Sequence, residues 1–165
     1  MRLFTVRSVP ITGWSSHDPF NLRPNRKTLL LLTIGLLLFG AGEALLIAGG
    51  IGVSPWTVIA QGVGITVGIG IGAATLAVSL VVLLFWIPLR QRIGIGTVLN
   101  AIIISVTIEF LLPYLPAFES TSVNILQACV GTIVVGLGSG IYLIANLGPG
   151  PRDGLMTGLQ RVSGA

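Results

Sequence analysis

Five polar or charged residues inside or beside the long apolar stretches of this chain are candidates for chemistry: Glu43, Gln61, Asn146, Arg152 and Asp153. An ionised carboxylate in a hydrocarbon environment is costly, so Glu43 must face a polar interior, be protonated or lie shallowly. It would therefore serve in ion or proton coupling, or lie at the outer interface. Gln61 and Asn146 would contact a solute, or satisfy backbone groups freed by nearby Gly-Pro breaks.

Arg152 and Asp153 open a short segment that begins at Pro151. An acidic residue is favourable at a helix N-terminus, and an arginine there can bind a phosphate or a lipid headgroup. The alternative is a local ion pair with a role in membrane orientation. Glu109 is a weaker candidate that could share a site with Glu43, since both are expected near the outer face, or simply reach the headgroups.

The side chains that enzymes and metal sites need are scarce. The chain has one cysteine and one histidine, and no Ser/His/Asp or Cys/His arrangement can be assembled. Cys129 is expected to be a small core residue. We therefore expect no catalytic residues, no metal, no cofactor and no enzymatic activity.

Composition indicates where these residues lie. The 165 residues are 53% hydrophobic and 8% charged, whereas soluble domains are about 25% charged. This composition excludes an ordinary soluble enzyme, a disordered chain and a coiled coil. It indicates an all-α integral membrane protein, because the apolar runs are continuous and do not alternate as membrane β-strands do.

Four apolar runs approach or exceed the length of about 20 residues that a helix needs to cross a bilayer. The predicted spans are Thr28–Ala48, Ile65–Pro88, Ile93–Leu112 and Val123–Leu147. Residues 1–27 are expected to be an irregular cytoplasmic tail before a membrane domain of residues 28–165. With four spans, all nine basic residues fall on one side of the membrane, and this pattern predicts a cytoplasmic N-terminus. The same pattern explains the excess of basic over acidic residues without a nucleic-acid partner.

The chain repeats itself after a shift of 96 residues. Seven glycines and prolines coincide over 34 positions, from Gly35 on Gly131 to Gly68 on Gly164. Each copy reads as a membrane helix, a break and a short helix, at about 55–64 and 151–161. The structural residues of the breaks are Gly52, Pro55, Gly148 and Pro151.

Three crossings between the copies would make the repeat inverted, a recurrent transporter design. The first unit covers about residues 28–113 and the second about 123–165. If the duplication is complete, we expect two further helices in the second unit, about 50 to 60 residues with their connections. A missing C-terminal half or a second copy in a homo-oligomer would supply them. The glycines at 35, 40, 42, 131, 136, 138 and 140 are expected to permit close helix contacts.

The two breaks carry a family resemblance. Gly52-Val53-Ser54-Pro55-Trp56-Thr57-Val58 and the more specific stretch from Leu147 to Leu159 resemble YczE-type bacterial membrane proteins of the YczE/YyaS/YitT grouping. The resemblance covers about residues 28–165 and implies a multi-pass protein of the bacterial inner membrane whose activity is not established. Thr57 departs from the pattern, which would place an acid there.

These patterns favour a transporter or permease for a small solute or ion, with its site between the two short helices. The alternative is an accessory or scaffold membrane subunit that transports nothing. The expected partners are the lipid bilayer and the solute or ion.

Overall fold

The computed structural model describes residues 12–163, which form six α-helices and one 3-10 turn and contain no strand. Predictions that fall on residues 1–11 and 164–165, including most of the tail's first half and the pairing of Gly68 with Gly164, lie outside the described residues. The elements are α1 (Arg26–Gly49), α2 (Pro55–Val67), α3 (Ile71–Trp86), α4 (Ile95–Leu111), η1 (Leu112–Tyr114), α5 (Thr121–Ile144) and α6 (Pro151–Ser163).

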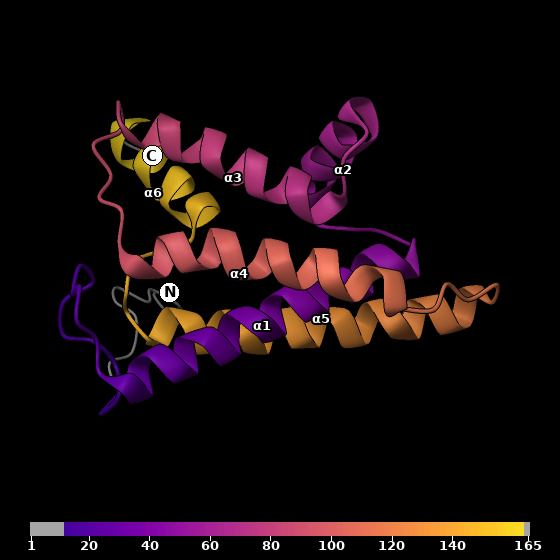
Figure 1. Ribbon diagram of the computed structural model, residues 1–165, viewed down its shortest axis with the longest axis horizontal. Coiled ribbons are helices and arrows are strands. Elements are labelled where there is room, and N and C mark those ends of the chain that lie inside the picture. The colour runs from indigo at the N-terminus through magenta and orange to yellow at the C-terminus, as the bar shows by residue number, and fades with distance from the viewer. Residues whose placement is uncertain (1–11, 164–165) are drawn as a thin grey trace, which may run out of the picture.

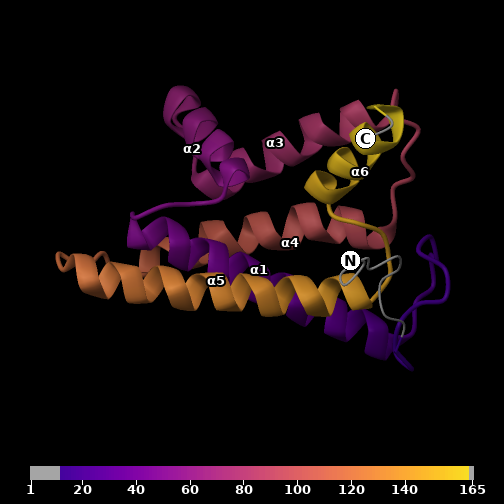
Figure 2. The same cartoon turned by 180° about the vertical axis from the view of Figure 1, so that it is seen from behind.

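The long helices run roughly along the long axis of the molecule and stack in layers across it (Figures 1 and 2). Helices α1 and α5 lie side by side and run in opposite directions, with α4 beside α1 and α3 on α4. The two short helices, α2 and α6, both contact α3. Helix α2 projects away from the bundle, whereas α6 lies against it (Figure 1).

The helical class is confirmed, and one predicted span has different bounds. Helices α1 and α5, and α4 with its 3-10 extension, are each long and apolar enough to cross a membrane; α2 and α3 together would make a fourth span, bent by 113°. The run predicted at residues 65–88 begins inside α2. Gly68 ends that helix at φ 76°, its N–H bonding to the Gly64 carbonyl, and α3 starts only at Ile71.

A break follows each of the helices α1 and α5, and left-handed backbone conformations occur at Gly50, Asn146 and Gly148. Gly50 caps the C-terminus of α1 at φ 63°. Ser54 is the N-cap of α2, and its hydroxyl accepts a hydrogen bond from the Thr57 N–H. After α5, Asn146 and Gly148 have φ of 53° and 104°. Proline stands at the first position of both short helices, where a missing N–H costs nothing. These features end a long helix and restart a short one in a new direction.

Glycines bring α1 and α5 into backbone contact. A Cβ atom on Gly35 would lie 2.8 Å from the Tyr142 nitrogen, and one on Gly138 would lie 2.5 Å from the Phe39 nitrogen. The packing predicted for these glycines is therefore confirmed. It is wrong for Gly136 and Gly140, where an added Cβ would meet nothing within 4 Å.

The outward faces of the long helices are apolar. Their exposed residues include Leu37 on α1, Val106 on α4, and Ile133 and Leu137 on α5. Exposed apolar surface of this extent is rare on soluble monomers and suits contact with lipid. Cys129 lies on the exposed face of α5, so its prediction as a core residue is wrong.

Candidate functional site

A cavity of about 50 Å³ lies where the six helices and the two breaks converge. On a measure by which one water needs about 10–15 Å³, it holds several water-sized groups. Its wall combines aromatic and aliphatic side chains with a small set of polar groups, as solute sites do. The polar members are Glu43, Ser54, Thr57, Thr75, Ser79, Asn100, Tyr142, Arg152 and Asp153.

The N-termini of both short helices line this cavity. Ser54, Trp56 and Thr57 come from the start of α2, and Arg152 and Asp153 from the start of α6. A helix N-terminus has N–H groups without intrahelical partners and about half a positive charge. The two breaks therefore direct two weakly positive ends toward one small space.

Glu43 reaches the start of α2 from α1. Its carboxylate is 4% exposed, and Oε2 accepts a 2.7 Å hydrogen bond from the Thr57 hydroxyl. That hydroxyl also lies 2.8 Å from the Ser54 hydroxyl. The carboxylate is thus buried inside the helix bundle, where the Thr57 hydroxyl supplies a hydrogen bond.

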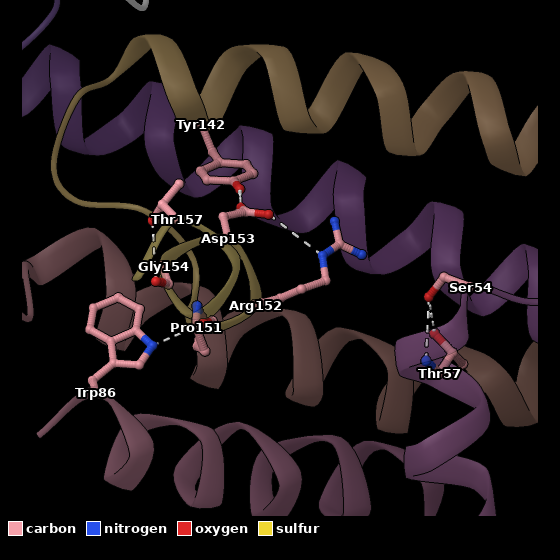
Figure 3. Close-up of polar contacts among 9 residues, drawn as sticks. All are labelled: Ser54, Thr57, Trp86, Tyr142, Pro151, Arg152, Asp153, Gly154 and Thr157. Atoms are coloured by element: carbon pink, nitrogen blue, oxygen red, sulfur yellow. Dashed lines mark hydrogen bonds and ion pairs between the residues drawn. The ribbon is translucent and has the colours of Figure 1, made fainter. Parts of the chain in front are cut away.

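Arg152, Asp153 and Tyr142 form the second polar group of the wall (Figure 3). The Arg152 Nε lies 3.5 Å from Asp153 Oδ1, and the Tyr142 hydroxyl donates to Oδ2 of the same carboxylate. The Arg152 guanidinium also lies 5.7 Å from the centre of the Phe39 ring. Its side chain extends toward Ser54 and Thr57 (Figure 3) and lines the cavity, and its contact with Asp153 is the local ion pair that the sequence offered as an alternative.

The two breaks carry the same acid–hydroxyl pair with the partners exchanged. At the first, the acid Glu43 is on the long helix and the hydroxyl of Thr57 on the short one. At the second, the hydroxyl of Tyr142 is on the long helix and the acid Asp153 on the short one. Thr57 and Asp153 are the third residues of their helices. The acid missing from position 57 is therefore replaced by a carboxylate from α1.

Helix α6 is held in place by contacts behind the cavity. The Trp86 indole is 1% exposed, and its Nε1 donates a 3.1 Å hydrogen bond to the Pro151 carbonyl. The Thr97 hydroxyl donates to the Pro149 carbonyl at 2.7 Å. These bonds fix the second break and the first residue of α6, which precede Arg152 and Asp153.

The five candidate residues divide into two groups. Glu43, Arg152 and Asp153 line the one cavity, whereas Gln61 and Asn146 do not. Gln61 is half-buried on α2 and makes no side-chain hydrogen bond to residues 12–163. Asn146 donates a 2.8 Å hydrogen bond to the Ser16 carbonyl, so it ties the segment before α1 to the second break.

Several residues that line the cavity were not among the candidates predicted from the sequence. Asn100, Ser79 and Tyr142 are polar residues inside predicted spans, which is a signal that the sequence does contain. Ser79 and Asn100 are 6% and 9% exposed, and neither has a side-chain hydrogen bond to a described residue. Their polarity alone could have nominated them, but only the fold brings them to the cavity.

Glu109 contacts a different helix from the one that Glu43 contacts. Its Oε2 accepts hydrogen bonds from the Gly72 and Ala73 N–H groups, at 2.8 and 3.2 Å. The N-cap of α3 is Gly70, which offers no side-chain cap. Glu109 therefore caps α3 from α4, and it does not line the cavity that Glu43 lines.

We expect Glu109→Ala to lower the free energy of unfolding by about 0.5–2 kcal/mol, the usual effect of removing a helix cap. The measurement is an SDS titration of the purified protein in mixed micelles, followed by circular dichroism. Glu119→Ala is the matched control, because that exposed carboxylate accepts no hydrogen bond from residues 12–163. Equal midpoints for the two variants would contradict the capping role.

One protein family and two individual relatives are similar to this chain. The family of unknown function DUF6198 matches residues 26–165. An uncharacterised protein of Haemophilus influenzae is 35% identical over 158 residues, 93% of this chain and 70% of the relative. The uncharacterised membrane protein YczE of Bacillus subtilis is 35% identical over 130 residues, 74% of this chain and 58% of YczE.

These relatives confirm the YczE-type resemblance. The chain spans 70% and 58% of the lengths of the two proteins. No solved structure matches it. The membrane-protein relative and the apolar helices together identify a multi-pass integral membrane protein.

Proposed function

The chain belongs to DUF6198, a family of unknown function, and we propose that it acts as a permease-like carrier of a small polar solute or ion. One observation carries the proposal: the N-termini of α2 and α6 line a single cavity together with Glu43 and Arg152. Transporters commonly bind solutes where interrupted helices end inside the membrane. A buried charge such as that of Glu43 is expensive in such a place and usually functional.

The arrangement of the two units supports this proposal. Helices α1 and α5 are antiparallel neighbours, and each is followed by a break and a short helix (Figure 1). This is the order that an inverted repeat would give, with the cavity at the junction of its two units. We propose no enzymatic activity, since the sequence contains no Ser/His/Asp or Cys/His arrangement.

We place the protein in the bacterial inner membrane with its N-terminus in the cytoplasm. The start of α1 and the loop between α3 and α4 lie at the same end of the molecule (Figure 1). Arg26 and Lys27 belong to the first, and Arg90 and Arg92 to the second. Basic residues favour the cytoplasmic side, so this end faces inward.

The test is flux into liposomes that contain the purified full chain. The panel comprises labelled small amino acids, carboxylates, amines and inorganic ions. We expect one class to be taken up, and Glu43→Gln or Arg152→Gln to reduce its uptake at least tenfold. Gln61→Ala is the control, because Gln61 lies on α2 outside the cavity and should leave uptake unchanged.

Two results would overturn the proposal. One is normal uptake by both cavity variants. The other is absence of flux for the whole panel together with copurification of a stoichiometric partner, which would favour the accessory or scaffold subunit.

A further inference from the structure

Two largely buried side chains contribute polar groups to the cavity wall without hydrogen-bonding to a described residue. Asn100 on α4 and Ser79 on α3 are 9% and 6% exposed and make no side-chain hydrogen bond to residues 12–163. Buried polar groups are nearly always paired with protein or ordered water. Both line the cavity, and the Asn100 amide lies against the start of α6, about 3.0 Å from where a Cβ on Gly150 would be.

The charged groups of the wall also keep free bonding capacity. Glu43 uses Oε2 for Thr57, and its Oε1 accepts no hydrogen bond from a described residue. Arg152 contacts Asp153 through Nε, which leaves its two terminal nitrogens without a hydrogen-bond partner in residues 12–163. An open anionic acceptor and an open cationic donor therefore lie on the same cavity.

The wall as a whole is close to neutral. Two carboxylates, Glu43 and Asp153, are balanced by Arg152 and by two helix N-termini that each contribute about half a positive charge. A ligand of large net charge would be left uncompensated at this low-dielectric position. A neutral ligand with separated charges would match both the balance and the open groups.

We infer that this cavity binds a small zwitterion with an ammonium and a carboxylate group, an inference that rests on the proposed function and specifies its substrate class. The carboxylate pairs with Arg152 and the N-terminus of α6. The ammonium pairs with Glu43. Asn100 and Ser79, which each offer a donor and an acceptor, complete the hydrogen bonds of the solute. The volume of about 50 Å³ suits a solute of roughly the size of glycine.

The test is equilibrium binding of glycine to the purified full chain in nanodiscs. Tryptophan fluorescence monitors the binding, since Trp56 lines the cavity. Acetate, methylammonium and urea are the comparison probes, and they carry only the negative charge, only the positive charge or neither. We expect saturable glycine binding at least tenfold tighter than that of each comparison probe. Equal binding of any one of them, or no saturable binding of glycine, would overturn the inference.

Ser79 and Ser105 provide a matched pair of variants. Ser79→Ala should weaken glycine binding about fivefold, the usual effect of one lost hydrogen bond. Ser105→Ala is the control, because Ser105 is 3% exposed with an unpartnered hydroxyl but does not line the cavity. Neither variant should lower the stability of the ligand-free protein, whereas a purely structural serine would do so. Equal effects of the two variants on binding would contradict the assignment.

The outcome separates this inference from the transport proposal. Glycine binding without flux of any solute would leave the zwitterion site standing and overturn transport. Flux of a different solute class without glycine binding would support transport and overturn the zwitterion site.

Discussion

Gly138→Ala should destabilise the protein by about 3 kcal/mol or more, although it adds one methyl group. The new Cβ would lie 2.5 Å from the Phe39 nitrogen and 2.6 Å from the Gly35 carbonyl oxygen. Both are backbone atoms of α1, so no side chain can rotate to make room. Overpacking usually costs about 1–3 kcal/mol, and a backbone contact belongs at or above the top of that range.

The same helix contains two matched controls. Gly136→Ala and Gly140→Ala place a Cβ where nothing lies within 4 Å. Alanine is a better helix former than glycine by up to about 1 kcal/mol, so both controls should match or exceed the parent protein in stability. The measurement is the midpoint of unfolding in mixed SDS micelles. A Gly138→Ala midpoint within error of the Gly136→Ala midpoint would show that α1 and α5 do not pack in this way.

The Gly138→Ala substitution should also disturb the residues that line the cavity. Phe39 and Tyr142 lie on the same two helices, and their rings pack edge to face with centroids 6.2 Å apart. Phe39 lies beneath Arg152, and Tyr142 holds Asp153. Moving α5 away from α1 would therefore disturb both charged residues in the first turn of α6, and the variant should lose solute binding even where it remains helical.

Most of the fold could be predicted from the sequence, because hydropathy and break residues are local signals. The long helices and both Gly-Pro breaks follow from them. The bend at Gly68 was missed because apolar residues continue across it without a change in composition. The contacting glycines could not be separated from Gly136 and Gly140, since the face a helix turns to its neighbour depends on the crossing geometry.

The site was predicted only in part, for a physical reason. Glu43, Arg152 and Asp153 stand out because charges are rare in apolar stretches. Asn100 and Ser79 are neutral, and such residues are common in membrane helices as packing or hydrogen-bonding groups. The cap that Glu109 supplies to α3 joins residues 36 and 37 positions apart, and no local pattern reports a contact of that range.

Trp86→Ala should release α6 from the bundle and cost about 3–5 kcal/mol, as large-to-small changes at buried aromatic positions do. The indole is 1% exposed and belongs to a cluster with Val78 and Val82, against which Leu155 of α6 packs. Its hydrogen bond to the Pro151 carbonyl would also be lost. Phe85→Ala is the control, since Phe85 precedes Trp86 in the sequence and is 56% exposed.

The specific readout is amide hydrogen exchange. In Trp86→Ala, residues of α6 should exchange faster while α1 and α5 keep their protection. Trp86→Phe should retain the packing and lose mainly the hydrogen bond, with a cost of about 1 kcal/mol. Unchanged protection of α6 in Trp86→Ala would show that the indole does not anchor it.

A second substitution distinguishes an anchor from general damage. A Cβ on Gly154 would lie 2.0 Å from the Trp86 ring, so Gly154→Ala should by itself displace α6. In the Trp86→Ala background that collision disappears, and adding Gly154→Ala should then cost little. The resulting non-additivity would assign the contact to this pair of residues, whereas additive losses would mean that α6 is held elsewhere. Because Arg152 and Asp153 begin this helix, the same cycle measured by glycine binding would show whether docking of α6 assembles the cavity.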